Sequence, residues 1–318
     1  MILPLPLPLP LPLLEAHDTR KVGREKEIVK CVIKTMVWGT VFCVVSGCAT
    51  TQVREDLQGL GLAYKLKEMQ SPRPNRAHIL QVDLSAGKTR PVVVLPDDPD
   101  GDGPAEVALT SPLKLAAEGP VLAFVNTNPW DDIPDDAGEK NRHWYEGQPV
   151  DIHGLAATHG HIRSSAGTGN VPVWMNEKGR VFLGEAPEQA AVVEGVAGFG
   201  QLVREGNLVA PAEGPLHPRT AMGVNRDGTV LWLVVVDGRQ PGFSEGMSER
   251  ELGNLMLEMG CWNAGNMDGG GSSVMGMRMA NGRIEVINSP SDRSPSMPGV
   301  PKIRPLPMIL TICERNSG

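Results

Sequence analysis

The sequence has few aromatic residues, no excess of positive charge and no long apolar run. Only 4% of its 318 residues are Phe, Trp or Tyr, and the formal net charge is −7. A nucleic-acid-binding protein needs a basic face that neutralises phosphates, so this balance argues against that class. No stretch of 18 apolar residues occurs, which excludes a membrane-spanning helix from the sequence but leaves a lipid anchor open. The C-x-x-C and H-E-x-x-H patterns of zinc sites are also absent, so we expect loop histidines, rather than metal ligands, at His153, His159 and His161.

The first 47 residues differ in composition from the rest of the chain. Residues 3–13 repeat Leu-Pro, which indicates either an extended polyproline-type segment or translation from a misassigned start. Further on, Lys30 and Lys34 precede an apolar run at residues 36–45 and then Ser46-Gly47-Cys48. This order resembles a bacterial lipoprotein signal, in which the cysteine thiol receives a diacylglycerol. The alternative is a buried strand that ends in cysteine.

The lipoprotein interpretation predicts a mature chain that is lipid-anchored to the membrane through Cys48, in the bacterial cell envelope and facing the periplasm or the exterior. Residues 48–75 would form a partly helical tether, and residues 76–318 one folded domain. Two cysteines remain besides the anchor. Because two cysteines in a chain of this size do not make a disulfide framework, we expect buried free thiols at Cys261 and Cys313.

Beyond residue 78, short β-type runs alternate with turn signals, as the 37 glycines and 28 prolines suggest. Hairpins are predicted around residues 176–179, 225–228 and 281–282, and residues 307–312 form a closing strand. We expect residues 126–170 to be long loops around one or two strands. The pattern predicts an α+β fold of one domain, with hairpin-rich mixed or antiparallel sheets and a few inserted helices.

Two helices are predicted. Ser111 and Pro112 are typical of a short helix start, with serine as the cap and proline in the first turn. A longer helix begins after Ser248, which forms a capping box with Glu251, and apolar residues then follow at helical spacing up to Met259. Gly260 suits the left-handed position after its end.

Residues 266–273, Asn-Met-Asp-Gly-Gly-Gly-Ser-Ser, are the strongest candidate for a functional loop. Three successive glycines are costly in chain entropy, so a structural requirement must select them. Close approach of backbone N–H groups to an anionic ligand would explain all three, with Ser272 and Ser273 as further donors. The spacing does not match a P-loop, a dinucleotide-binding motif or the serine elbow of hydrolases.

Two further motifs lie at strand ends. Asp237-Gly238-Arg239 follows the apolar run of residues 230–236, and His217-Pro218-Arg219-Thr220 begins a strand. Taken singly, the first could be a plain turn and the second could hold a surface arginine.

Together these motifs resemble the phosphodiester glycosidase family, which includes bacterial proteins related to exopolysaccharide biosynthesis. The resemblance covers roughly residues 79–312 and is most specific between Arg219 and Ser273. It also extends to Asn126 and to the segments 288–290 and 302–305. Asn128-Pro129-Trp130 departs from the Gly-aromatic pair usual in the family, and this departure falls in the expected substrate pocket.

The resemblance implies a hydrolase, in the cell envelope, that cleaves the glycosidic bond of a sugar-1-phosphodiester with an N-acetylglucosamine-like sugar. The substrate would be a sugar-phosphate glycan or glycoconjugate, and no cofactor is required. A phosphate monoester leaves as a stable anion, so charge stabilisation by arginine matters more than strong proton donation. The alternatives are a non-catalytic envelope lipoprotein that binds anionic glycans or acts in exopolysaccharide processing, and a structural calcium site at residues 97–103 or 131–136.

On this basis we assign roles to the motif residues. Asp268 is expected to be the nucleophile or general base, with Asp237 or Glu245 as the second carboxylate. The phosphate is expected to contact Arg219, Arg239, Arg304, Ser272 and the amides of Gly269, Gly270 and Gly271. The remaining substrate contacts are expected from Asn126, Asn266, Thr220 and Ser244. An internal ion pair between Asp237 and Arg304 is the structural alternative for those two residues.

Overall fold

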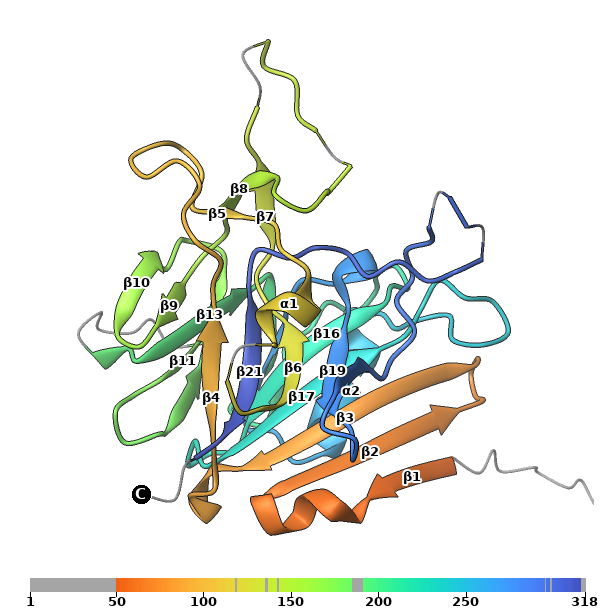
Figure 1. Ribbon diagram of the computed structural model, residues 1–318. Coiled ribbons are helices and arrows are strands. Elements are labelled where there is room, and N and C mark those ends of the chain that lie inside the picture. The colour runs from red at the N-terminus through yellow and green to blue at the C-terminus, as the bar shows by residue number, and fades with distance from the viewer. Residues whose placement is uncertain are drawn as a thin grey trace, which may run out of the picture. The chain divides into compact units, whose positions relative to one another are not determined.

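The computed structural model describes residues 50–117, 119–134, 137–141, 143–184, 191–294, 296–297 and 299–315. All of them lie within one compact unit, residues 46–318. The unit is built mostly from antiparallel sheets with few helices (Figure 1). The Leu-Pro repeat and Cys48 lie outside the described residues. None of the described helices is both long and apolar enough to cross a membrane.

The largest sheet has eight strands in the order β1-β2-β3-β17-β16-β18-β14-β15. In that order they are β1 (Thr50–Arg54), β2 (Leu62–Met69), β3 (Asn75–Asp83), β17 (Val230–Val236), β16 (Arg219–Val224), β18 (Asn263–Asn266), β14 (Gly200–Arg204) and β15 (Asn207–Leu208). Both faces of its centre are covered. Leu231, Leu233 and Val235 of β17 face one core cluster, whereas the alternating residues between them face another. This two-sided burial explains why β17 is apolar along its length.

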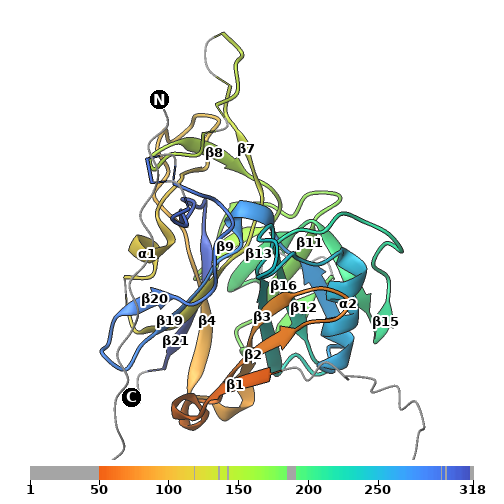
Figure 2. The ribbon, with the colours of Figure 1, turned by 90° about the vertical axis from the view of Figure 1, so that its right-hand side faces the viewer.

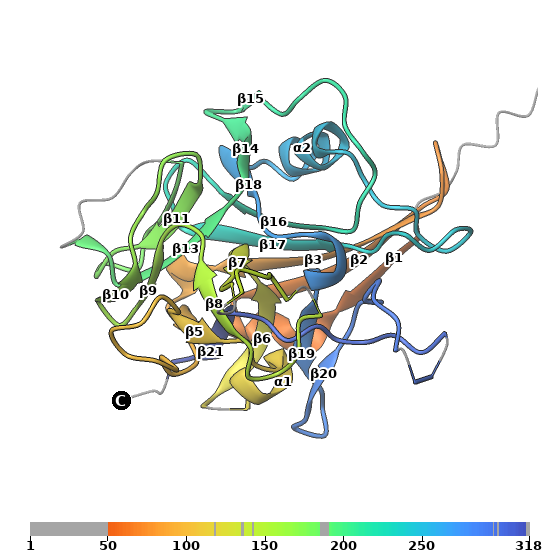
Figure 3. The same cartoon turned by 90° about the horizontal axis from the view of Figure 1, so that it is seen from above.

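One core cluster lies under helix α2 (Glu249–Glu258), which packs on β14, β15, β16 and β18. Figures 2 and 3 show α2 on one side of the large sheet and β6, β19 and β21 on the other. The predicted capping box is present, with Ser248 accepting from the Glu251 amide and Glu251 accepting from the Ser248 amide. Gly260 has a φ of 87°, so both predicted ends of this helix are confirmed.

Two five-stranded sheets and one three-stranded sheet complete the unit. The first five-stranded sheet contains, in spatial order, β10 (His161–Ser164), β9 (Ala156–Thr158), β13 (Glu194–Gly198), β11 (Val171–Met175) and β12 (Val181–Leu183). The second contains β20 (Ile284–Val286), β19 (Met275–Arg278), β6 (Val121–Asn126), β21 (Ile309–Glu314) and β4 (Thr89–Val94). The small sheet contains β5 (Val107–Ala108), β8 (Pro149–Ile152) and β7 (Trp130–Asp132). The three predicted hairpins are confirmed as β11–β12, β16–β17 and β19–β20.

The predicted tether is wrong over residues 62–69. These residues form β2, which pairs with β3 along its whole length. Leu62, Tyr64 and Leu66 are buried while the residues between them are exposed. This alternation is the signature of a half-buried strand, so β2 is part of the folded sheet. A 3-10 turn, Glu55–Leu60, joins it to β1.

Three smaller expectations need correction. Helix α1 (Pro112–Leu115) forms as predicted, but the Ser111 side chain makes no capping hydrogen bond. Residues 126–170 contain four short strands, β7 to β10, rather than one or two, because three- and four-residue strands carry little periodic signal. The closing strand begins at Ile309 and not at residue 307.

The two remaining cysteines are buried and free, as expected. Cys261 packs in the cluster under α2, and Cys313 lies on β21 in a separate cluster. Burial raises the pKa of the Cys261 thiol to about 12, so this thiol stays protonated and unreactive at neutral pH.

Candidate active site

Asp268 lies where two open surface clefts meet. The two clefts have volumes of about 250 and 280 Å³, which is enough for a sugar ring or a phosphate group. The first cleft is lined by Pro129, Trp130, Asp131 and Asp132, and the second by His217, Pro218, Arg219, Arg239 and residues 266–270. Both clefts share Trp144, Phe199, Asp268 and Arg304. One end of the combined groove is therefore acidic and aromatic, and the other is basic.

The backbone of Asp268 is fixed by segments that are distant in sequence. The chain leaves β18 at Asn266, and the Asp268 amide donates to the carbonyl of Thr127 at 2.9 Å. The Asn126 side chain donates to the Asp268 carbonyl at 2.7 Å, and its own oxygen accepts from Thr220 Oγ1 at 2.7 Å. Asn126 and Thr220 are buried, and their side chains hold the loop at Asp268 by hydrogen bonds within the protein. The substrate contacts predicted for them are therefore not supported.

The Asp268 carboxyl is electrostatically poised. Burial raises its pKa to about 6, although a hydrogen bond from Ser272, the charge of Arg304 and the Gly269 amide all act to lower it. A carboxyl with a pKa near neutrality can lose or accept a proton at physiological pH, which suits a catalytic group. Ser272 itself is buried and also accepts from Arg304 Nη1 at 3.3 Å.

Each of the three glycines after Asp268 has a steric reason of its own. A Cβ at position 269 would press on the Pro218 carbonyl, and Gly270 has a φ of 62° and lies against the Arg239 guanidinium. A Cβ at position 271 would collide with the Arg304 guanidinium and the Asp292 carboxylate. The glycines therefore allow two arginines to approach the loop beside Asp268.

The predicted phosphate-binding role of the glycine amides is not supported for the first two. The Gly269 amide donates to Asp268 Oδ1 at 2.9 Å, and the Gly270 amide donates to the Pro218 carbonyl at 2.9 Å. These donors are consumed inside the protein, because the tight turn directs them back toward its own chain. An anion at this loop would instead meet the guanidinium groups.

Arg304 is held in place from two sides. Its guanidinium forms a two-pronged pair with Asp292, with Nε to Oδ2 at 2.9 Å and Nη2 to Oδ1 at 3.1 Å. It also lies over the ring of Trp144, 4.1 Å from the centroid. Asp292, and not Asp237, is therefore its ionic partner, so the alternative of an Asp237–Arg304 pair is wrong.

Arg239 and Arg219 line the basic cleft in different ways. Arg239 is exposed and has a φ of 58°, a left-handed conformation that is rare for a residue with a side chain and common at functional sites. Arg219 is buried, and its donors reach the carbonyls of Met247 and Pro215 and the carboxylate of Glu249. Arg239 is thus the exposed charge of this cleft, while Arg219 also secures its wall.

The substrate contact expected from Asn266 stays a prediction. Asn266 lines the basic cleft, and its side chain is only 3% exposed. Among the described residues, its Oδ1 has no hydrogen-bond partner. This oxygen is itself buried, so its lack of a partner does not show that it reaches a ligand in the cleft.

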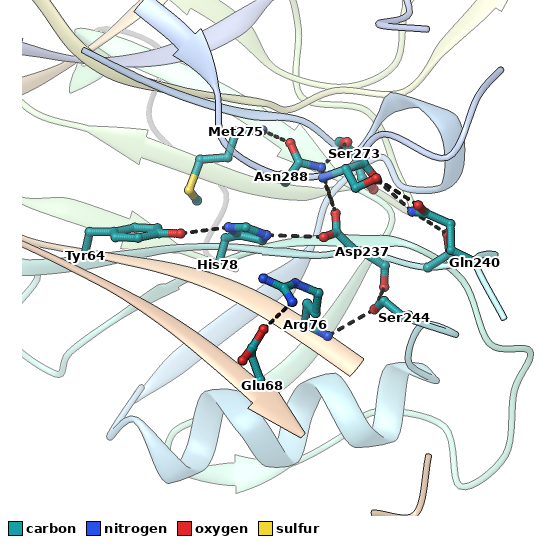
Figure 4. Close-up of polar contacts among 12 residues, drawn as sticks. Tyr64, Glu68, Arg76, His78, Asp237, Gln240, Ser244, Ser273, Met275 and Asn288 are labelled. Atoms are coloured by element: carbon teal, nitrogen blue, oxygen red, sulfur yellow. Dashed lines mark hydrogen bonds and ion pairs between the residues drawn. The ribbon is translucent and has the colours of Figure 1, made fainter. Parts of the chain in front are cut away.

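Asp237, predicted to be catalytic, lies in a buried network instead (Figure 4). It is 1% exposed and lines neither cleft. Oδ1 accepts from Asn288 Nδ2 at 3.1 Å and from the Ser289 amide at 2.8 Å, while Oδ2 contacts His78 Nε2 at 3.2 Å. His78 is in turn bonded to the Tyr64 hydroxyl. The carboxylate therefore joins β2, β3 and β17 to the segment at residues 288–289.

Two more predicted site residues are not placed at the clefts. The Ser244 hydroxyl is buried, donates to the Asp237 carbonyl at 2.7 Å and accepts from the Arg76 amide (Figure 4). Glu245 lines neither cleft, and its backbone bonds to Pro74 and Arg239. Both residues shape the loop that presents Arg239.

The groove residues without a site role assigned from the sequence include Trp130, Asp131, Trp144, Phe199 and His217. Phe199 is 50% exposed, and Trp144 has a φ of 44°. The exposed ring of Phe199 suits stacking on a sugar. In a chain this poor in aromatics, Trp144 and Phe199, which lie outside the strands, were an available signal. His217 lies two residues before Arg219, where the most specific part of the resemblance begins.

No group of three or more His, Cys, Asp or Glu in the described part of the chain could hold a metal ion. In the acidic loop, Asp98 Oδ1 accepts from the amides of Asp100 and Gly101, so the loop is closed by its own backbone. His153 pairs with Asp131 at 3.0 Å. Part of the second calcium candidate, residues 135–136, lies outside the described residues.

The phosphodiester glycosidase family profile matches residues 138–312, more than half of the chain. The fold is similar to the zebrafish N-acetylglucosamine-1-phosphodiester alpha-N-acetylglucosaminidase catalytic domain, auto-inhibited by its pro-peptide. The TM-score is 0.59 and the identity 20%, over 84% of this chain and 88% of that chain.

Two further similarities are more limited. A hypothetical protein from Synechocystis has a TM-score of 0.55 and 11% identity, over 84% of this chain and 64% of that chain. A 57-residue stretch is 46% identical to the uncharacterized SPbeta prophage-derived protein YomE of Bacillus subtilis strain 168. That match spans 18% of this chain and 8% of that protein.

Proposed function

The chain belongs to the phosphodiester glycosidase family, and we propose that it hydrolyses the bond between the anomeric carbon of a sugar and a phosphodiester oxygen. The observation that carries the proposal is the position of Asp268, a carboxyl whose pKa is raised to about 6. It lies between an aromatic, acidic cleft and an arginine-lined one. A sugar and a phosphate need these two environments on either side of the bond that breaks.

The charge distribution orients the substrate. Arg239 and Arg304 attract the phosphate, because a guanidinium matches two phosphate oxygens with parallel donors. The sugar then extends into the opposite cleft, where Trp130 offers an apolar ring and Asp131 a hydroxyl acceptor. The anomeric carbon is left beside Asp268.

In the reaction the bond from the anomeric carbon to the phosphate oxygen breaks, and both electrons leave with the phosphate. The ionised Asp268 either attacks the anomeric carbon, forming a glycosyl ester that water then cleaves to release the sugar and free the carboxylate, or takes a proton from a water that attacks the carbon directly. In both routes water supplies the new hydroxyl. Arg239 and Arg304 stabilise the charge that develops on the leaving phosphate. Asp131 takes the place of Asp237 and Glu245 as the second carboxylate. Its hydrogen bond to His153 lowers its pKa, so it stays ionised.

For the sugar and the location we keep the expectations from the sequence. The sugar is N-acetylglucosamine-like, and the protein acts in the cell envelope, anchored through Cys48. Supporting these are the substrate named for the zebrafish relative and the lipoprotein-like signal before Cys48. Exopolysaccharide processing is one setting for such an activity.

The test is sugar release by the purified full-length chain in mild detergent. A panel of sugar-1-phosphodiesters is offered, led by an α-linked N-acetylglucosamine phosphodiester. Asp268→Asn should reduce turnover at least ~100-fold, in the range of general acid–base groups. Asp227→Asn, the same change in an exposed turn, should leave turnover unchanged. No release across the panel by a folded protein that still binds phosphoglycans would favour the non-catalytic binding protein.

A further inference from the structure

We propose that His217 contacts the substrate phosphate as a neutral hydrogen-bond donor through its Nε2–H. This inference rests on the proposed function and adds a group that the charged residues do not supply. His217 lines the basic cleft together with Asp268, Arg219 and Arg239.

The imidazole is carried by a rigid backbone. The His217 amide donates to the Met247 carbonyl at 3.2 Å, and the Met247 amide returns a bond to the His217 carbonyl at 3.0 Å. Gly246, with a φ of 100°, packs against the His217 carbonyl so closely that a Cβ would collide with it. A donor fixed before the substrate arrives needs no reorganisation during the reaction.

The contact with Arg239 determines the tautomer. Arg239 Nη2 lies 3.3 Å from His217 Nδ1. A guanidinium has only donors, so Nδ1 must be the acceptor in this hydrogen bond. In a neutral imidazole the proton is then on Nε2, and no described residue is its partner. Nε2–H is therefore free for a phosphate oxygen.

Partial burial and the neighbouring cations favour the neutral imidazole. Partial burial and the cations of Arg239 and Arg219 lower the pKa of His217, and Glu249 opposes them. Asp268 and Arg304 line the same cleft. A proton added to Nδ1 would break the bond to Arg239 and place two cations side by side. His217 thus acts in its neutral form.

The chemical role follows from the leaving group. As the bond to the anomeric carbon breaks, charge develops on the bridging phosphate oxygen, and Nε2–H donates a hydrogen bond to that oxygen. No proton is transferred, because the phosphate leaves as an anion and the imidazole keeps its hydrogen. The hydrogen bond from His217 therefore stabilises the transition state more than the bound substrate, so removing the imidazole should lower kcat more than it raises KM.

Two substitutions test the donor by its geometry. Glutamine places an amide N–H near the position of Nε2, whereas alanine supplies no donor. His217→Ala should lower kcat about 100-fold, the scale of one lost donor at a developing anion, and His217→Gln should retain activity to within about tenfold. Equal losses in both variants, with KM rather than kcat changed, would overturn the proposal.

A second measurement does not depend on turnover. Nitrogen-15 NMR of the imidazoles in the full-length chain should show His217 as the Nε2–H tautomer, and inorganic phosphate should shift its Nε2–H signal. In Arg239→Ala, His217 should lose its preference for the Nε2–H tautomer. A phosphate response in a protein that releases no sugar would support the donor while the proposed function fails. Sugar release without any phosphate response or tautomer preference would overturn the donor alone.

Discussion

Asp237 and Asp268 follow strands β17 and β18 of the same sheet, which are separated by β16, yet the two carboxyl groups lie in opposite environments. Asp237 comes directly after β17 and accepts hydrogen bonds from Asn288 and Ser289 deep inside the protein. Asp268 comes two residues after β18 and faces both clefts, next to Arg304. The same side chain therefore holds segments together at one strand end and is available for chemistry at the other. Both carboxylates accept hydrogen bonds from the protein, but only Asp268 also lines the clefts, whereas Asp237 is 1% exposed and lines neither.

The largest expected effect on stability is at Asp237. Asp237→Ala leaves Asn288, the Ser289 amide and His78 without their buried acceptor, and it should lower the free energy of unfolding by about 3 kcal/mol. Urea denaturation measures this change. Asp227→Ala, the same substitution in an exposed turn, is the control and should cost far less. An equal decrease in the free energy of unfolding in the two variants would contradict the structural role of Asp237.

A smaller effect is expected on the other side of the comparison, at Gly271. Gly271→Ala introduces a methyl group where the Arg304 guanidinium meets Asp292, and displacing the arginine should lower kcat/KM about tenfold, or ~1.4 kcal/mol. Gly214→Ala, at a glycine with open space around it, is the matched control. Steady-state kinetics on both variants distinguish them, and unchanged kcat/KM in Gly271→Ala would show that Arg304 is not required at the loop.

The third effect, at Asp268, has the opposite sign to that at Asp237. Folding raises the pKa of Asp268 from 3.8 to about 6, so the folded state holds this proton more tightly than the unfolded chain. The ionised carboxylate therefore costs stability above pH 6, and the cost disappears below about pH 4. Asp268→Asn should be more stable than wild type by about 3 kcal/mol at pH 8, and the difference should vanish near pH 4. Denaturation curves at the two pH values test this, and a variant less stable at pH 8 would contradict it.

Local signals were sufficient for much of the fold. The turn at residues 225–228 and the capping box at Ser248 each depend on a few adjacent residues, and both were predicted correctly. Strand β2 was missed because its alternation of Leu62, Tyr64 and Leu66 was assigned to a tether next to the proposed anchor. Antiparallel sheets were predicted from the sequence, but the order in which their strands pair was not. That order joins strands from distant parts of the chain.

The site was predictable only in part, for the same reason. The motif around Asp268 was identified, and Arg239 and Arg304 do reach it. Asp237 is held away from the clefts by hydrogen bonds from Asn288 and Ser289, some 50 residues further along the chain. The three glycines were read as amide donors, whereas they make room for arginines whose approach no local pattern reveals. Trp144 lies in the connection between β7 and β8, and the path of this connection places it in the groove.

The most direct test of the account is the rate of sugar release per folded molecule for wild type, Asp268→Asn and Asp237→Asn, measured side by side. Normalising to the folded fraction separates chemistry from stability. We expect Asp268→Asn to lose at least ~100-fold, and Asp237→Asn to stay within about tenfold of wild type. A folded Asp237→Asn protein without activity, together with an active Asp268→Asn protein, would contradict the assignment of the two carboxylates.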